Sequence, residues 1–259
     1  MKKSSKMHNT QYYLKEYLKE RPLFLSLTRS CESPLYQKYL PLQKPVLDLG
    51  CGDGFFAKVT FAQQIDIGLD MVDSRLKENK YNSYKKIVTY DGKRIPYPDN
   101  YFATVVSNCV LEHIPDIDQT LSEIYRVLKK GGLFLTTVMS APWEEYLFGN
   151  IFLGDIYKKW MRKKQEHHTI LKERQWKNKF KKHTFRIIDE SGYIDKTAAR
   201  WIDCLHYACI PNLVTYILMR RWVLWPMLNR FIPTEYFANL LDKQVSSTES
   251  ACIFFVLRK

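Results

Sequence analysis

The sequence lacks the cysteine spacing of a zinc or disulfide protein. Its six cysteines include no Cys-x-x-Cys pair and follow no secreted framework, so we expect reduced thiols and no metal site. Residues 1–6 lead into a polar segment and not into the apolar stretch of a secretory signal. The apolar segment 213–225 is interrupted by two arginines and is shorter than the roughly twenty residues that cross a bilayer. These absences favour a cytoplasmic protein.

Acidic residues are scarce relative to basic ones. The chain has 27 Asp and Glu against 40 Lys and Arg, which gives a net charge of +13. Such an excess favours encounters with nucleic acid, an anionic membrane or an acidic substrate. The charge is uneven, because residues 158–183 hold eleven basic side chains and only Glu166 and Glu173 as acids. The same window is equally consistent with a solvated helix face.

The most informative stretch is an apolar strand, residues 46–49, that runs into a turn with alternate glycines at Gly50, Gly52 and Gly54. Glycine lets the backbone turn tightly and approach a ligand, and the helix that follows offers unpaired N–H groups. The dinucleotide pattern G-x-G-x-x-G places its third glycine where this chain has Phe55. The turn therefore predicts a ligand cradle with little room for a pyrophosphate.

Acids follow the next two expected strands. A second apolar run ends in Asp70, whose carboxylate can accept hydrogen bonds from both hydroxyls of a ribose. A third run ends at Asp91. Residues 105–114 and 121–132 then read as a fourth strand and as the helix before a fifth.

These features together resemble the class I S-adenosylmethionine-dependent methyltransferases, and in particular their small-molecule "type 11" family. Asp-x-Gly-x-Gly-x-Gly at residues 48–54 is similar to the family's motif I, and the resemblance is close over residues 42–140 and loose over 165–259. It implies S-adenosylmethionine as cofactor, with Asp70 at the ribose and Asp91 at the adenine amino group. The cofactor contacts it implies are Asp48, Gly50, Cys51, Gly52, Gly54, Asp70, Met71, Asp91, Gly92 and Asn108.

The resemblance also implies the fold. We expect an α/β protein with a Rossmann-like, seven-stranded, mostly parallel sheet in the order 3-2-1-4-5-7-6, with strand 7 antiparallel and helices on both faces. With 46% hydrophobic residues over 259 positions, one domain is expected. Its parts would be an N-terminal helical segment (1–40), a cofactor-binding core (41–140), a basic helical lid or acceptor region (141–195), and strands six and seven with an apolar helical insertion (196–259).

Hydrophobic spacing places the individual elements. Residues 12–18 suit one face of a helix, with aromatics that we expect to be packing residues. Helical spacing also covers residues 116–130, where Gly131 is a suitable stop. Further elements are expected at residues 133–138 (fifth strand), 150–190 (helical, with Trp176, Phe180, Ile187 and Ile188 spaced for burial and Gly192 after its end), 197–203 (sixth strand) and 251–257 (seventh strand).

The insertion between the last two strands has two interpretations. Residues 213–225 combine aliphatic side chains with tryptophans and arginines, which suits a helix lying in a membrane interface. They also suit a helix that packs on the domain and shapes an apolar substrate pocket. The sequence does not decide between these two interpretations. Under the first of them, we expect peripheral contact with the anionic inner face of a membrane.

The chemistry implied by the resemblance requires few special residues. Methyl transfer depends mainly on aligning two bound molecules and excluding water, although an oxygen acceptor gains from a nearby base. His168 is our first candidate for that base and His113 our second.

We expect O- or C-methylation of a small-molecule, lipid-linked or glycan-linked acceptor. The alternatives are an RNA methyltransferase, although residues 107–110 lack the Asn/Asp-Pro-Pro-Tyr pattern of base amino methylation, or a non-catalytic scaffold that binds the cofactor.

Overall fold

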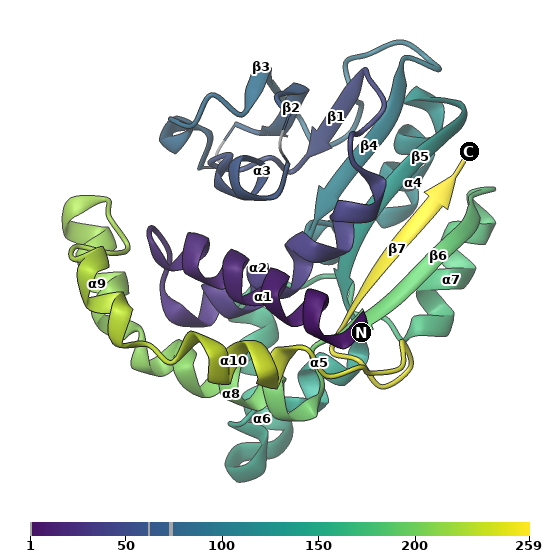
Figure 1. Ribbon diagram of the computed structural model, residues 1–259. Coiled ribbons are helices and arrows are strands. Elements are labelled where there is room, and N and C mark those ends of the chain that lie inside the picture. Colours follow the sequence, from purple (N-terminus) through teal and green to yellow (C-terminus); the bar gives the residue numbers. More distant parts are fainter. Residues whose placement is uncertain (1, 62, 73–74) are drawn as a thin grey trace.

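Residues 2–61, 63–72 and 75–259 are described by the computed structural model, and they form a seven-stranded sheet between layers of helices (Figure 1). The order is β3-β2-β1-β4-β5-β7-β6, with β7 antiparallel to both neighbours and the other pairs parallel. The expected class, strand order and direction of the last strand are confirmed. The strands are β1 (Val46–Leu49), β2 (Ile65–Met71), β3 (Tyr84–Tyr90), β4 (Phe102–Asn108), β5 (Leu128–Met139), β6 (Arg186–Tyr193) and β7 (Cys252–Arg258).

Helices cover both faces of this sheet. They are α1 (Lys2–Leu18), α2 (Leu23–Tyr36), α3 (Phe55–Thr60), α4 (Ile117–Val127), α5 (Ala141–Tyr146), α6 (Asn150–Lys164), α7 (Glu173–Lys182), α8 (Lys196–Ala208), α9 (Ile210–Met219) and α10 (Thr234–Leu241), with short 3₁₀ helices η1 (Gln37–Tyr39), η2 (Arg75–Glu78), η3 (Leu111–His113) and η4 (Pro226–Phe231). On β7, Phe254 and Val256 join a core with α1, α2 and α8, whereas Ile253 and Phe255 join a core with α4 and α7. The split arises because successive strand side chains project to opposite faces.

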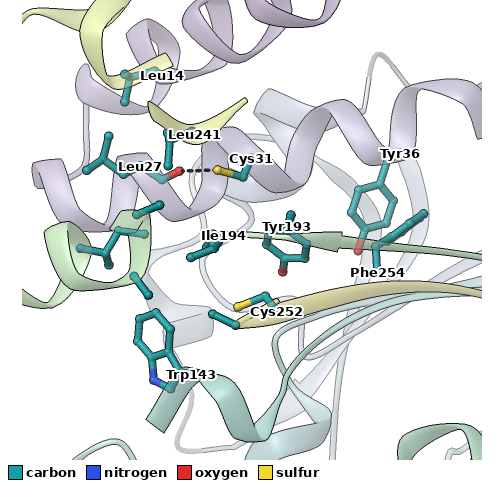
Figure 2. Close-up of a cluster of buried hydrophobic side chains, with 14 of the residues drawn as sticks. Leu14, Leu27, Cys31, Tyr36, Trp143, Tyr193, Ile194, Leu241, Cys252 and Phe254 are labelled. Carbon is teal, nitrogen blue, oxygen red and sulfur yellow. Dashed lines mark hydrogen bonds between the residues drawn. The ribbon is translucent and has the colours of Figure 1, made fainter. Parts of the chain in front are cut away.

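The N-terminal segment is helical, as predicted, and belongs to the first of these cores. Leu14 of α1, Leu27 of α2 and Leu241 of α10 gather near the start of β7 (Figure 2). Tyr13 and Tyr17 are buried, which confirms that they are packing residues, whereas Tyr12 is exposed and the expectation was wrong for it. The two N-terminal helices therefore lie across the carboxyl ends of the central strands, next to the glycine turn.

The helix predicted over residues 116–130 ends earlier, at Val127. Leu128 already pairs with Phe102 as the first residue of β5, and the register then shifts before the next pair. Gly131 has a φ angle of 77°. It lies where the register of β5 shifts, and it does not end a helix. Sheet pairing therefore overrides the helical spacing at these positions.

The prediction of a sixth strand at residues 197–203 was wrong. That segment is in α8, and the strand is β6, a few residues earlier. Asp195 caps α8, because its Oδ1 accepts a hydrogen bond from the backbone N–H of Ala198 at 2.7 Å. Ala198, Ala199 and Ile202 are then buried at steps of one and three, which is a helical spacing and not the alternation of a strand.

The helical region predicted at residues 150–190 is divided. Helices α6 and α7 occupy much of it, with Trp176 and Phe180 of α7 fully buried as predicted. Residues 186–190 belong instead to β6, so Gly192 lies within a strand and not after a helix, and Ile188, which was expected to be buried, is exposed on this edge strand.

No single helix in the described ranges is long and apolar enough to cross a membrane. Helices α8 and α9, bent by 51° at their junction, meet the length and composition criteria only as a pair.

Candidate cofactor and acceptor site

The glycine turn lies at the carboxyl end of β1, between β2 and β4. Gly50, Gly52 and Gly54 all have positive φ angles, of 75°, 50° and 77°. A Cβ atom on Gly50 would lie 2.3 Å from a methyl carbon of Val110, so no other residue fits there without a shift. In an open α/β sheet this is the position where ligands bind.

The carboxylate of Asp70 is held against this turn. Its Oδ2 accepts a hydrogen bond from the backbone N–H of Gly52, and its Oδ1 from that of Met71, each at 2.7 Å. The structure thus brings Asp70 to the glycine turn, as the ribose assignment requires.

The other predicted contacts lie beyond this point, along the strand ends. A Cβ atom on Gly92 would be 3.7 Å from the sulfur of Met71, so these two residues are neighbours. Asp91 follows β3 on the surface, and backbone N–H groups of Lys93 and Arg94 donate to its carboxylate, which lowers its pKa. The predicted residues therefore form a row from β1 to β3.

A cavity of about 110 Å³ adjoins the turn. Five of the predicted cofactor residues line it, namely Asp48, Gly50, Cys51, Gly52 and Asn108. Sequence reasoning missed the rest of its wall: Tyr17, Arg21, Leu25 and Arg29 from α1, α2 and their junction, Asp53, Phe55 and Phe56 next to the turn, and Arg75 from η2.

Arg21 closes this cavity toward the helices. Its Nη2 donates to Oδ2 of Asp53 at 2.5 Å, both side chains are buried, and its guanidinium lies 4.3 Å from the ring centroid of Phe55. The junction of α1 and α2 is thereby tied to the glycine turn.

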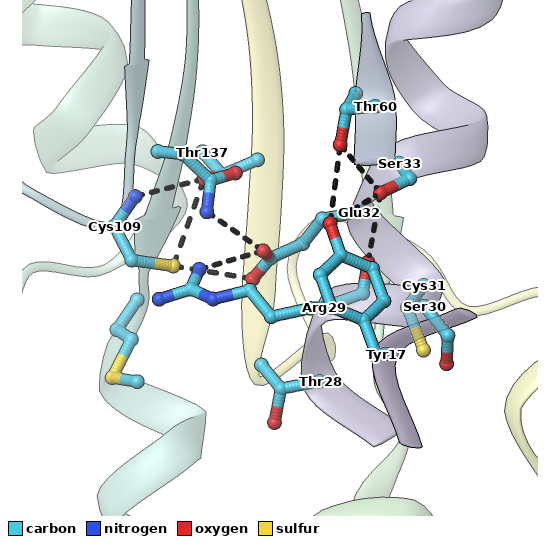
Figure 3. A network of polar contacts seen from close by, with 12 residues as sticks. Tyr17, Thr28, Arg29, Ser30, Cys31, Glu32, Ser33, Thr60, Cys109 and Thr137 are labelled. Carbon is cyan, nitrogen blue, oxygen red and sulfur yellow. Dashed lines mark hydrogen bonds and ion pairs between the residues drawn. The ribbon is translucent and has the colours of Figure 1, made fainter. Parts of the chain in front are cut away.

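A buried polar network fixes α2 and Asn108 (Figure 3). Glu32 of α2, fully buried, accepts from Arg29 Nη1 at 2.6 Å and from Asn108 Nδ2 at 2.8 Å. Thr137 of β5 donates to the amide oxygen of Asn108 at 3.0 Å. The amide of Asn108 is therefore oriented from both sides, with its side chain at the cavity wall.

A second cavity, of about 90 Å³, lies on the other side of Arg29. It shares Leu25 and Arg29 with the first, so the two are adjacent. The remaining wall is mostly apolar with a few polar groups: Phe24, Thr28, Cys109, Met139, Trp143, Gln165, Ile202, Asp203 and His206. A molecule bound here would lie next to one bound at the glycine turn.

His206 of α8 is the histidine in this second wall. Its ring packs against that of Phe24, with ring centroids 4.5 Å apart, and burial lowers its pKa from the ordinary value. The imidazole is therefore neutral at physiological pH and can accept a proton. No sequence motif marks His206, because its position depends on α8 folding against α2.

The predicted histidines lie elsewhere. His168 is exposed after α6, and His113 packs against His167 with ring centroids 4.9 Å apart. Neither His168 nor His113 lines either of the two cavities that the described residues form around Arg29. Their catalytic role stays a prediction.

The sequence also matches known proteins. Residues 47–136 match the family described as "Methyltransferase domain". A demethylmenaquinone methyltransferase from Symbiobacterium thermophilum is 31% identical over 119 residues, which cover 42% of this chain and 47% of that protein. A sterol 24-C-methyltransferase from Pneumocystis carinii is 37% identical over 98 residues, 34% of this chain and 26% of that protein. The chain thus spans about half or less of the length of these relatives.

The fold has a counterpart among crystal structures. A protein from Thermotoga maritima, described as an S-adenosylmethionine-dependent methyltransferase and possible histamine N-methyltransferase, has a TM-score of 0.58 at 16% identity and covers 97% of this chain and 99% of its own. At that identity the likeness concerns the fold alone. The family match over residues 47–136, together with the strand order and the placement of Asp70 against the glycine turn, identifies this part of the chain as a domain of the class I S-adenosylmethionine-dependent methyltransferase type.

Proposed function

We propose that the protein transfers a methyl group from S-adenosylmethionine to an oxygen or carbon atom of a small, mainly apolar acceptor. The observation that carries the proposal is the pair of adjacent cavities that share Leu25 and Arg29. One adjoins the glycine turn and the other has a largely apolar wall. Bound molecules would be held side by side, which is the arrangement that an in-line transfer needs.

The first cavity suits the cofactor by charge and shape. Its wall carries the acids Asp48 and Asp53 together with three arginines, a mixture that complements an amino acid group with both charges. Because Gly50 has no Cβ atom, a ligand can approach its backbone closely. The carboxylate of Asp70, held against the same turn, is in reach of ribose hydroxyls. S-adenosylmethionine, when bound, supplies the electrophilic methyl group.

The second cavity suits an acceptor with an apolar body and a polar edge. Side chains such as Phe24, Trp143 and Ile202 can exclude water from the acceptor, and His206 can take a proton from a hydroxyl or an acidic carbon. We assign the base to His206 because it lines the cavity.

The acceptor class follows the same reasoning. Relatives described as demethylmenaquinone and sterol methyltransferases support an apolar, lipid-like acceptor, to which we add lipid-linked or glycan-linked molecules. We include peripheral contact with the inner face of a membrane in this proposal.

The basic window, residues 158–183, does not favour RNA as the acceptor. Several of its cations already contact carboxylates, which reduces the charge available to phosphates. The pairs are Lys158 with Glu145, Arg162 with Glu144, Lys177 with Glu173 and Glu190, and Lys179 and Lys182 with Asp118.

Calorimetry tests the cofactor assignment. Wild-type protein should bind S-adenosylmethionine, and Asp70→Ala should weaken that binding by about 1.5 to 3 kcal/mol, the range for hydrogen bonds to a charged group. Asp155→Ala, which removes an exposed carboxylate on α6, is the control and should bind as wild type. Heat on addition of NAD with none from S-adenosylmethionine would refute the proposal.

Affinity for S-adenosylmethionine should also rise with pH. Burial raises the pKa of Asp48 to about 7, although Tyr84 donates a hydrogen bond of 2.7 Å to it. The cationic ligand favours the ionised form of Asp48. Below pH 7 the Asp48 carboxyl group must therefore lose a proton when the ligand binds, which weakens binding, whereas above pH 7 it is already ionised. Between about pH 6 and pH 8 the affinity should increase by up to roughly tenfold, because a carboxyl group with a pKa of about 7 is about one-tenth ionised at pH 6 and about nine-tenths ionised at pH 8.

Two comparisons check this pH dependence. Asp48→Asn should bind with nearly the same affinity at both pH values. The demethylated product, which has no sulfonium charge, should show a smaller change than the cofactor. A flat profile for the wild-type protein would remove Asp48 from the cofactor contacts.

A further inference from the structure

Helix α9 presents its apolar side to solvent. Its six large apolar side chains are all exposed, including Ile217 at 63%, Leu218 at 74% and Met219 at 60%. Ile210, Leu213 and Ile217 recur at steps of three and four, and Val214 and Leu218 follow them at a step of four, so these side chains form one stripe. A surface helix of a soluble domain normally turns such a stripe inward.

The inner side of α9 is polar and aromatic. Asn212 donates to the backbone oxygen of Trp222 at 2.8 Å, and Thr215 donates to that of Arg221 at 3.0 Å. Tyr216 stacks on Trp222 with ring centroids 4.2 Å apart and contacts Glu78 of η2. These contacts fix the rotation of the helix, so the outward stripe is a consequence of specific packing.

The segment after α9 adds more exposed apolar side chains and only positive charge. Trp225 is 68% exposed and Phe231 71%. Residues 204–234 contain no Asp or Glu, and their three arginines, Arg220, Arg221 and Arg230, are exposed. In Figure 1, α9 projects at the edge of the molecule beyond α8.

We propose that the apolar stripe of α9 docks on an anionic lipid bilayer, with the three arginines at the headgroups. Apolar insertion and cationic attraction are the two signals that reversible membrane binding uses. A ten-residue helix is about 15 Å long and cannot cross a hydrocarbon core of about 30 Å, so α9 lies flat in the interface. A second copy on the same surface would bring like charges together without acids to offset them.

Docking of α9 also orients the second cavity. Helix α8 carries Ile202 and His206 in the cavity wall and leads directly into α9 through Cys209. A lipid-like acceptor would then have a short path from the bilayer to the cavity. This consequence rests on the proposed function, whereas the docking itself does not.

Co-sedimentation with vesicles tests the docking, without cofactor or acceptor. The protein should pellet with vesicles of phosphatidylcholine containing phosphatidylglycerol at low salt, be released as salt rises, and stay in solution with pure phosphatidylcholine. Ile217→Ser with Leu218→Ser should lower vesicle binding about tenfold or more, because two exposed side chains lose their insertion. The control Ile87→Ser with Ile188→Ser, which changes exposed isoleucines on the sheet edges, should bind as wild type.

A charge variant gives a second measurement that does not depend on the apolar pair. Arg220→Glu with Arg221→Glu should also lose binding about tenfold, whereas Lys129→Glu with Lys130→Glu, an exposed pair at the start of β5, should lose much less. All variants should retain the wild-type thermal midpoint, because the changed side chains are exposed.

Three outcomes would overturn the proposal. Wild-type protein could remain in solution with both kinds of vesicle, or each control could lose as much binding as its α9 counterpart. The protein could also be a dimer that Ile217→Ser with Leu218→Ser converts to a monomer, which would assign the stripe to a second copy. Normal calorimetric binding of S-adenosylmethionine alongside any of these results would leave the proposed methyl transfer standing and would remove only its membrane contact.

Discussion

Replacing Glu32 with alanine should lower the free energy of unfolding by about 3 to 5 kcal/mol, the usual range for breaking a buried ion pair. Glu32 is fully buried, and its carboxylate accepts hydrogen bonds from Arg29, Asn108, Cys109 and Tyr193. Its loss would leave the guanidinium of Arg29 without its counter-charge between two cavities. Denaturant unfolding monitored by circular dichroism measures the change.

Two further variants separate the charge from the packing. Arg29→Ala combined with Glu32→Ala should cost less than the sum of the single changes, because no unpaired charge remains. Glu16→Ala removes a partly exposed carboxylate paired with Lys19 and should change stability by less than about 1 kcal/mol. If Glu32→Ala were as mild as Glu16→Ala, the network would not anchor α2 over the strands.

The cofactor half of the site could be predicted because its signals are local. The glycine turn and Asp70 each follow a buried strand directly, and parallel strands end at one edge of a sheet. Asn108 follows the same logic at the end of β4. Knowing the strands was therefore enough to bring these residues together.

The acceptor half could not be read in this way. Arg29 and His206 are far apart in sequence and meet across the second cavity only because α2 and α8 pack against each other. The misplacement of the sixth strand hid this, because residues 197–203 were assigned to a strand, whereas they belong to the helix that carries His206. The cap at Asp195, which starts α8 after β6, was the local signal that could have corrected the assignment.

The outward stripe of α9 shows a different limit. The composition of residues 213–225 predicted a helix there. The helix α9 covers only residues 213–219 of that segment, and composition does not say which side of it faces the protein. The contacts of Asn212 and Tyr216 with Trp222 decide which side of α9 faces the protein, and no sequence pattern predicts them. Trp222 was expected to share in membrane contact with Trp225, yet it packs inward and only Trp225 is exposed.

Changing His206 to alanine should lower kcat by about a hundredfold or more, within the range for loss of a general base. Binding of S-adenosylmethionine should be unchanged, because His206 does not line the cavity at the glycine turn. The base must be neutral to act, so activity is lost as pH falls through its pKa, and burial lowers that pKa. Wild-type activity should therefore persist below about pH 6.5, the ordinary value for histidine, and the acidic limb should be absent from the variant.

His168→Ala is the matched comparison, because it removes an imidazole that lies outside both cavities. Single-turnover rates with a quinol-like or sterol-like acceptor would separate chemistry from product release in both variants. A hundredfold loss in His168→Ala with full activity in His206→Ala would return the base to the residue that the sequence favoured. It would also mean that the acceptor enters from the α6 side, over the exposed segment that carries His168, and not through the wall formed by α2 and α8.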